Sequence, residues 1–432
     1  MSSKTWCRLL VLLLLSAATA EFTVRGPVRL MTEGAQWNDF LSPYIQAKAW
    51  MLGGNPYSAD ELVSLWPSDN PRPLFVDRDR LAGVLAKKRG IPSPYPLTTF
   101  FLLYPFARFS WPIALRLWAV LNLTAVLGSF LALLSICGAS WRDLRSQIFL
   151  AIAFALAPIH TGLATANPAM LAVALTIGTV WAEHFRRENT AGILLALAVC
   201  LKPPLGLCLL FYYLVRRRWG IVTTATAMSA LIAIASVVRL AYAGIAWLPA
   251  YRRNIADNFG LGALDDFSTA NPARFNMINL QVVFSSLFGN RSIADAMALG
   301  CGAVLLGIWL WLLVKRQRHE VLELSALFVL SLLPVYHRFY DAGLLLWPLC
   351  WSVLVVTKRS LTLLVVVLLS PFLFPGAAFL DGLLQSGKIS RAIADRWWWN
   401  AIVMPHEAWA VMLLSILFLY FMSVRPSQAV RL

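Results

Sequence analysis

The stretch Trp37-Asn38-Asp39-Phe40-Leu41-Ser42-Pro43-Tyr44 is polar and rich in turn residues, and it runs on to Gly53-Gly54-Asn55-Pro56-Tyr57. On both sides lie apolar runs that are too long for the helices of a soluble core. A carboxylate in this stretch would therefore lie in water just outside a membrane. We take Asp39 as its chemical centre, either as a catalytic acid or as an ordinary helix cap.

The composition is that of a polytopic membrane protein. Of the 432 residues, 59% are hydrophobic and 13% are charged, and the mean hydropathy is +0.67. Soluble domains are about half apolar and about a quarter charged. Lysine and arginine outnumber aspartate and glutamate by 37 to 21, but they occur in short clusters between apolar runs. This pattern follows the positive-inside rule and does not indicate a nucleic-acid partner.

The cysteines indicate neither a disulfide framework nor a metal site. They lie in or beside apolar runs, without a Cys-x-x-Cys pair or a histidine at zinc spacing. They are Cys7, Cys137, Cys200, Cys208, Cys301 and Cys350. Asp265-Asp266 resembles a metal site only weakly, because adjacent acids seldom share one ion without further ligands. We therefore expect no metal and no other cofactor.

Residues 1–24 form either a signal peptide or a first membrane span. Lys4 and Arg8 precede an apolar core, and Ala-Ala-Thr-Ala precedes Glu21, as in a cleavable signal. The apolar stretch continues to about Val24 and many spans follow, so we favour an uncleaved signal anchor.

Residues 25–93 are polar and are expected to form a large first extracytoplasmic loop. Within it, Ser42 before Pro43 predicts the N-cap of a helix, and Gly53-Gly54 predicts its end. The resulting helix of about ten residues is expected to lie along the membrane surface.

We expect residues 94–432 to form an all-α bundle, which gives the chain about 11–12 transmembrane or re-entrant helices in a single domain, 1–432. The apolar segments lie at about 94–107, 112–137, 146–160, 167–185, 190–216, 220–244, 292–314, 321–335, 342–357, 361–380 and 408–424. Basic clusters between them are expected in the cytoplasm. The segment at 94–107 must then begin and end outside, so we expect it to be re-entrant or to lie on the surface.

This topology places most chemically capable side chains on the outward side. They are Asp39, His160, Asn167, Lys202, Arg252, Arg253, Asp257, Asp265, Asp266, Arg274, His337, Arg338, Tyr340, Asp341 and His406. The inward loops contain little but arginine and lysine. We therefore expect the function on the extracytoplasmic face.

Two of these residues each have a functional and a structural interpretation. Asp39 can be a general base at the membrane interface, where partial shielding from water would raise its basicity, or Asn38 or Asp39 can cap the helix after Pro43. Lys202, in Leu201-Lys202-Pro203-Pro204, is a charge at membrane depth beside a broken helix. It can meet an anion such as a lipid phosphate, or extend from a helix end to the headgroups.

The late segment Tyr336-His337-Arg338-Phe339-Tyr340-Asp341 contains five polar or ionisable side chains after Pro334. Its arginine can clamp a phosphate, and its histidine can donate to a leaving group or orient a hydroxyl. The alternative is a structural network that joins two helices. Asn167, before Pro168, is by itself typical of a helix cap. Arg252, Arg253 and Arg274 are candidates for phosphate or headgroup contacts.

Taken in order, these pieces resemble the family-87 glycosyltransferases of the GT-C superfamily, membrane enzymes that take sugars from polyprenyl-phosphate donors. The family pattern is an Asp-containing loop that ends in Gly-Gly-Asn-Pro-Tyr, a Tyr-Pro, a Gly-Gln-x-Asn-like helix start, an apolar-Lys-Pro turn and a late His/Asp motif. The matching residues are Asp39 with Gly53 to Tyr57, Tyr95-Pro96, Ala166-Asn167-Pro168, Lys202-Pro203, and His337 with Asp341. Ala166-Asn167 replaces Gly-Gln, and Tyr336-His337-Arg338 replaces a Trp-Asp-His-His form. These departures concern the substrate more than the fold.

The resemblance implies a GT-C-like bundle and an inverting, single-displacement sugar transfer. Asp39 would be the general base on the acceptor hydroxyl, and His337 a second catalytic residue. The donor phosphate would leave, with cations such as Lys202 and Arg338 offsetting its charge. The expected substrate-binding residues are Lys202, Arg338, Tyr340, Asp341, Asn167, Arg252 and Arg274.

The expected donor is polyprenyl-phosphate-linked mannose or arabinofuranose, and the acceptor is a lipid or a glycan. We expect the protein in the bacterial cytoplasmic membrane, surrounded by membrane lipids. A transporter or flippase of lipid-linked saccharides is the alternative, but it would need charges buried midway in its spans, and only Arg116 and Arg239 are so placed. A non-catalytic assembly subunit is a third interpretation.

Overall fold

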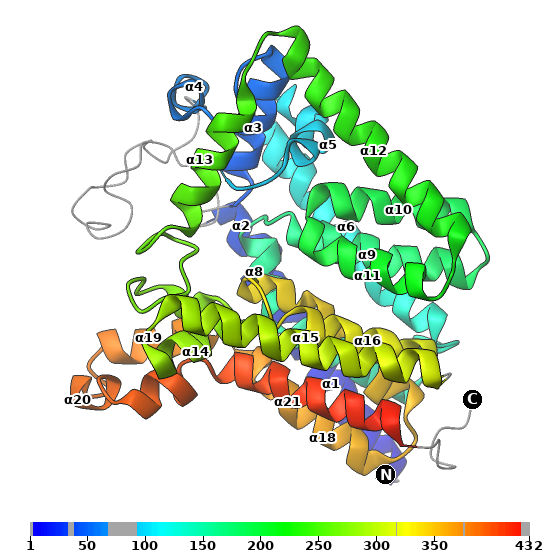
Figure 1. Cartoon of the computed structure of the whole chain (residues 1–432). Helices are drawn as coiled ribbons and strands as arrows, with labels where there is room; N and C mark the ends of the chain where they lie inside the picture. The colour runs from blue at the N-terminus through cyan, green and yellow to red at the C-terminus, as the bar shows by residue number, and fades with distance from the viewer. Residues whose placement is uncertain (1–2, 33–38, 68–92, 317, 375, 425–432) are drawn as a thin grey trace. The chain divides into compact units, whose positions relative to one another are not determined.

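The computed structural model describes residues 3–32, 39–67, 93–316, 318–374 and 376–424 (Figure 1). It is 78% helical. The described residues form no strand, and their one isolated bridge pairs Met277 with Arg338. The predicted all-α polytopic membrane fold is therefore confirmed.

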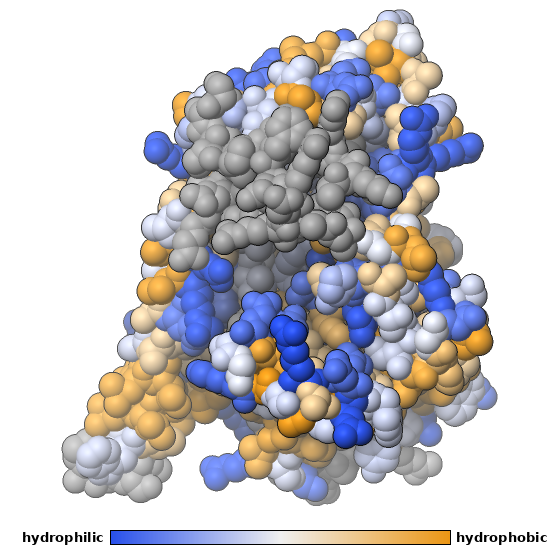
Figure 2. Space-filling view, turned by 90° about the vertical axis from the view of Figure 1, so that its left-hand side faces the viewer, coloured by the Kyte–Doolittle hydropathy of each residue, from blue (hydrophilic) through white to orange (hydrophobic). Residues whose placement is uncertain are grey.

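Among the residues that the structure describes, five helices are long and apolar enough to cross a membrane. They are Thr5–Thr32, Trp111–Ile136, Trp219–Tyr242, Arg291–Lys315 and His406–Ser423. Two further pairs of helices are bent at a short break, and the number of spans is seven if each pair crosses the membrane as one span. The described residues also form five shorter apolar helices, so they contain twelve apolar helical segments in all. Hydrophobic side chains remain exposed on these helices, as Leu13 does on the first, and Figure 2 shows such side chains in orange on one face.

The first helix is longer than predicted. It extends to Thr32, because a π-helical turn at Val24–Val28 accommodates Pro27 without ending the run. The polar loop therefore does not begin at residue 25. The prediction that this segment is an uncleaved anchor stays a prediction.

The chain forms two compact units, and the prediction of a single domain stays a prediction. One comprises Met1–Thr23, Leu133–Thr161 and Phe267–Leu432, and the other Val24–Ala132 and Gly162–Asp266. We call them the terminal unit and the middle unit. Helices α6 (Trp111–Ile136) and α8 (Ala157–Ala164) contain residues of both.

In the middle unit, α3 packs against α5, and α10 packs against both α9 and α12. Besides parts of α6 and α8, its helices are η1 (Val24–Val28), α2 (Arg29–Thr32), α3 (Leu41–Leu52), α4 (Ala59–Ser64), α5 (Leu97–Ala107), α9 (Ala169–His184), α10 (Glu188–Leu201), α11 (Pro203–Val215), α12 (Trp219–Tyr242) and α13 (Trp247–Phe259). The break predicted at Lys202 is confirmed, because α10 ends at Leu201 and α11 begins at Pro203. Helix α5 has 11 residues, fewer than the roughly 20 that a span needs.

Helix α3 differs from its prediction at its start. It begins at Leu41, with Phe40 and not Ser42 at the N-cap position, and the Ser42 hydroxyl donates to Gln46 Oε1 over 3.2 Å. Proline is tolerated throughout the first turn, so Pro43 did not mark the first residue. The predicted end is confirmed at Gly53, whose φ is 79°. Most of the helix is buried in the middle unit, and its predicted position along the membrane surface stays a prediction.

In the terminal unit, α1 packs against α7, and α15, α16 and α21 pack against one another (Figure 1). Its helices are α1 (Ser3–Thr23), α7 (Leu144–Ala155), η2 (Arg274–Asn276), α14 (Leu280–Phe288), α15 (Arg291–Lys315), α16 (Glu320–Ser331), η3 (Phe339–Leu345), α17 (Leu346–Cys350), η4 (Trp351–Val355), α18 (Arg359–Leu369), η5 (Ser370–Leu373), α19 (Gly376–Gln385), α20 (Arg391–Ala394), η6 (Trp399–Val403) and α21 (His406–Ser423).

Candidate functional site

Asp39 lies in the middle unit, held from two directions by the loop before α9. Its backbone N–H donates to the Thr165 carbonyl over 2.6 Å, and its Oδ2 accepts a 2.8 Å hydrogen bond from Nδ2 of Asn167. Asp39 itself is exposed, whereas Asn167 is buried. The prediction that the membrane interface partly shields this carboxylate from water stays a prediction.

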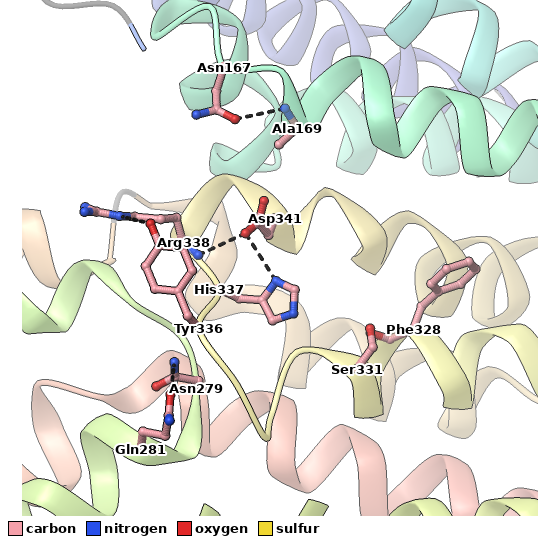
Figure 3. Close-up of polar contacts among 10 residues, drawn as sticks. All are labelled: Asn167, Ala169, Asn279, Gln281, Phe328, Ser331, Tyr336, His337, Arg338 and Asp341. Atoms are coloured by element: carbon pink, nitrogen blue, oxygen red, sulfur yellow. Dashed lines mark hydrogen bonds and ion pairs between the residues drawn. The ribbon is translucent and has the colours of Figure 1, made fainter. Parts of the chain in front are cut away.

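The side chain of Asn167 makes two contacts, and the first is the helix cap that the sequence indicates. Its Oδ1 accepts from the Ala169 N–H over 2.9 Å at the start of α9, as a helix cap does (Figure 3). Because the oxygen is engaged there, the amide nitrogen is the end that faces Asp39. The cap on α9 thus orients a donor onto the carboxylate.

A buried tryptophan, which sequence reasoning missed, supports both ends of this contact. Trp118 on α6 stacks on Phe40, with ring centroids 4.6 Å apart and planes 4° apart, and its Nε1 donates to the Ala166 carbonyl over 2.8 Å. The neighbours of Asp39 and of Asn167 are therefore fixed by one side chain. An indole inside an apolar run, with one N–H to satisfy, was the available signal.

The Gly-Gly-Asn-Pro-Tyr motif builds a turn. The Glu61 Oε2 accepts the Asn55 N–H over 2.6 Å, and a Cβ on Gly54 would lie 2.1 Å from that same oxygen. The Tyr57 hydroxyl donates to the Tyr95 carbonyl over 2.8 Å. Burial, with a smaller contribution from Tyr251, raises the pKa of Tyr57, so its hydroxyl remains a donor. The motif therefore ties the end of α3 to the chain just before α5.

Lys202 lies at the junction of α10 and α11, with φ −149° and ψ 87°, and is buried. Helix α5 satisfies the carbonyls at this break. Thr98 Oγ1 donates to the Cys200 carbonyl over 2.8 Å, and Thr99 Oγ1 to the Leu201 carbonyl over 3.0 Å. Hydrogen bonds from α5 thus stabilise the break between α10 and α11. Because Lys202 is buried, its side chain does not fit a lysine that extends to the headgroups.

In the terminal unit, His337 and Asp341 form a buried pair. His337 Nδ1 lies 3.2 Å from Asp341 Oδ2, and that oxygen also accepts the Arg338 N–H over 3.0 Å (Figure 3). Each of the two side chains is 1% exposed. The His337 carbonyl in turn accepts the Ile278 N–H over 3.0 Å. Asp341 therefore anchors the start of η3, so part of the predicted structural network is present.

Arg338 and Tyr340 flank this pair and are half-buried. Arg338 Nε donates to the Tyr336 hydroxyl over 2.8 Å (Figure 3). Arg274 is almost fully buried over the Phe275 ring, 4.2 Å from its centroid, and its Nη2 lies 3.4 Å from Asn400 Oδ1. These contacts give Arg274 a packing role within the terminal unit.

The remaining predicted residues are either exposed or in contact with the backbone. Arg252 and Arg253 are exposed on α13, and His406 Nδ1 lies 2.8 Å from the Val403 carbonyl. Asp265 and Asp266 are buried, and Asp266 Oδ2 accepts the Gly262 N–H over 2.8 Å. Within the described ranges, no group of three His, Cys, Asp or Glu side chains could hold a metal ion.

The two charges that favoured a transporter are not buried midway in a span. Arg239 lies in the last turn of α12, where its Nη2 donates to the Met51 carbonyl over 2.7 Å. Arg116 is exposed near the start of α6. Neither arginine is therefore a charge buried midway in a span, which is what a transporter would need.

The structure brings Asp39 and Asn167 together in the middle unit, which also contains Lys202 and Arg252. His337, Arg338, Tyr340, Asp341 and Arg274 belong to the terminal unit. Asn38, which the sequence offers as an alternative helix cap, lies outside the described residues.

A comparison with protein families finds a match to glycosyltransferase family 87 over residues 94–348, more than half of the chain. The matched residues include Asn167, Lys202 and His337, whereas Asp39 precedes them. No curated protein and no solved structure matches the chain.

Proposed function

The chain belongs to glycosyltransferase family 87, and from this premise we propose that it transfers a sugar from a polyprenyl-phosphate donor to a lipid or glycan acceptor, with Asp39 as the general base. The proposed sugar is mannose or arabinofuranose. The proposed location is the bacterial cytoplasmic membrane, with the reaction on its extracytoplasmic face, and the five long apolar helices support the membrane part of this proposal.

The proposed reaction is a single displacement. The acceptor hydroxyl oxygen attacks the anomeric carbon of the sugar while the bond from that carbon to the donor phosphate breaks. The hydroxyl proton passes to the Asp39 carboxylate, and the phosphate leaves with the bonding electrons. One displacement inverts the anomeric configuration.

One observation carries this role for Asp39: an exposed carboxylate whose Oδ2 and backbone N–H are both fixed by the segment Thr165 to Asn167. A general base has to reach a substrate hydroxyl and hold one orientation. Exposure provides the reach, and the buried Asn167 amide provides the orientation.

The cations supply the second part of the proposal. A phosphate leaving group gains charge as its bond to the sugar breaks, and fixed cations stabilise that charge. We assign this role to Lys202 at the α10–α11 break and to Arg338. In His337, the contact with Asp341 fixes the Nδ1 side of the ring and leaves Nε2 to orient or protonate the leaving phosphate. Tyr340, Asp341, Asn167, Arg252 and Arg274 complete the proposed binding residues.

The test is turnover by purified protein with polyprenyl-phosphate mannose or arabinofuranose. We expect Asp39→Asn to lower the rate by about 10²–10⁴-fold, the usual contribution of a general base. Asp60→Asn is the matched control, because Asp60 is an exposed acid of the same unit. Unchanged turnover in Asp39→Asn would reject Asp39 as the base. Movement of the labelled donor across liposomes, with no new glycosidic bond, would reject the transferase.

A further inference from the structure

Two cysteines that are far apart in the sequence meet in the terminal unit. Cys137 follows the last residue of α6 and Cys350 ends α17, and their Sγ atoms lie 3.3 Å apart across 213 residues of sequence. Both are free thiols. A disulfide bond is about 2.05 Å long, so the two sulfur atoms are in contact but not bonded.

The backbone on both sides of the pair is held in place. Gly138, with φ 60°, ends α6, and the N–H of Ala139 donates to the Leu134 carbonyl over 2.9 Å. Arg145 Nη1, at the start of α7, donates to the Val356 carbonyl over 3.0 Å just after η4. The two segments that carry the thiols are thus joined close to the sulfur atoms, and the contact does not depend on a single flexible loop.

The two thiols differ in access. Cys350 is fully buried, whereas Cys137 is partly exposed at the helix end. A reagent from solution can therefore reach Cys137 first, and Cys350 is placed to attack the sulfur next to it. This is the arrangement of an attacking and a resolving cysteine.

We propose that Cys137 and Cys350 are a modification site, a dithiol that a low-molecular-weight disulfide oxidises to an intramolecular cystine. The Cys137 thiolate attacks one sulfur of the reagent, which forms a mixed disulfide and releases one reagent thiolate. The Cys350 thiolate then attacks Sγ of Cys137 and displaces the second. The two cysteine protons pass to the two released thiolates, so two thiols are oxidised and one reagent disulfide is reduced.

The bond would connect two parts of the terminal unit. Cys350 lies on the helical run that begins with η3, the segment that Asp341 anchors at its start. A cystine would join this run covalently to the end of α6. The inference concerns the thiols alone and does not depend on the proposed transfer reaction.

The test uses full-length protein in which Cys7, Cys200, Cys208 and Cys301 are replaced by serine. After treatment with oxidised glutathione, intact-mass spectrometry is expected to show the loss of two hydrogens and no glutathione adduct. With the added Cys350→Ser replacement, we expect one stable glutathione on Cys137. With Cys137→Ser instead, we expect no reaction, because Cys350 is buried.

Three results would overturn the proposal. They are a glutathione adduct that persists on Cys137 while Cys350 is present, a cystine between two chains, and equal modification of Cys350 in Cys137→Ser. If the replaced background does not fold, the same treatment of the unmodified chain, followed by proteolysis and mapping of the linked peptides, decides the question. A peptide pair containing Cys137 and Cys350 supports the proposal, and its absence contradicts it.

Discussion

At the scale of single residues, Ala166 carries an unusual backbone strain. Its φ is 53°, in the left-handed region, and it occupies the position where the family pattern has glycine. A side chain in this region costs about 1 kcal/mol or more relative to glycine. We expect Ala166→Gly to stabilise the protein by up to about 1 kcal/mol, measured by thermal unfolding in detergent. Ala172→Gly, in the interior of α9, is the control and is expected to destabilise it by a similar amount.

Asn167 allows its two contacts to be separated. Aspartate at this position keeps an oxygen for the Ala169 N–H but has no N–H for Asp39, whereas alanine loses both contacts. Aspartate also buries a second carboxylate against that of Asp39. We therefore expect Asn167→Asp to lower the transfer rate at least tenfold and to destabilise the protein by about 1–3 kcal/mol. Asn167→Ala, which loses both hydrogen bonds, is also expected to lower the transfer rate and the free energy of unfolding. A full rate in Asn167→Asp would show that the amide does not position Asp39.

Single residues also show how far sequence reasoning reaches. The break at Lys202 and the stop at Gly53 were readable, because prolines and glycines act on their own backbone. The contact between Asn167 and Asp39 spans 128 residues and has no local signature. The same holds for the 213 residues between Cys137 and Cys350. Local chemistry is therefore predictable, and pairing across the fold is not.

At the scale of elements, the turn after α3 depends on a glycine for space. A Cβ on Gly54 would displace the Glu61 carboxylate from the Asn55 N–H. We expect Gly54→Ala and Glu61→Ala each to destabilise the protein by about 1–3 kcal/mol, because each removes that hydrogen bond. In the double variant the losses should not add, which a double-mutant cycle measures. Gly53→Ala is the control, because the φ of 79° at Gly53 strains any side chain, and it should destabilise the wild type and Glu61→Ala by the same amount. Additive losses for Gly54→Ala and Glu61→Ala would contradict this account.

The same turn makes stability depend on pH through Tyr57. Burial raises the pKa of this phenol above its ordinary value of 10.0. The unfolded chain loses the proton first, so the stabilisation is complete below about pH 10 and is lost as the pH rises further. We expect the unfolding midpoint of Tyr57→Phe to fall less between pH 9 and pH 11 than that of the wild type. If the unfolding midpoints of Tyr57→Phe and the wild type fall in parallel with pH, burial does not raise the pKa of Tyr57.

Helix α3 illustrates why an element can be predicted while its environment is not. Its length and its end followed from local residues, but its position along a membrane surface was inferred from its place in a polar loop. Apolar residues lie on every side of it, and Tyr44, Ile45 and Trp50 are all buried. A helix that is apolar all round belongs in an interior. Its partner α5 lies 45 residues further on, beyond the reach of local patterns.

At the scale of the whole molecule, the central expectation is that the catalytic residues and the basic clusters lie on opposite sides of the membrane. Helix α12, with 24 residues and few charges, is long enough to span the bilayer. Arg217 is exposed just before it and Arg252 is exposed on α13 just after it. The positive-inside rule assigns the cluster at Arg216 to Arg218 to the cytoplasm, so α13 should face outward.

We therefore expect Arg217→Cys and Arg252→Cys to be labelled from opposite sides of intact cells or sealed vesicles by a membrane-impermeant maleimide. The measurement uses a chain whose native cysteines are replaced by serine, with labelling after solubilisation as the reference for full reactivity. Asp60→Cys, in the first loop, should behave like Arg252→Cys, because that loop is expected outside. Labelling of Arg217→Cys and Arg252→Cys from the same side would mean that α12 does not cross the membrane. Outward labelling of Arg217→Cys alone would reverse the orientation and place Asp39 in the cytoplasm, where the proposed polyprenyl-phosphate chemistry on the outer face could not occur.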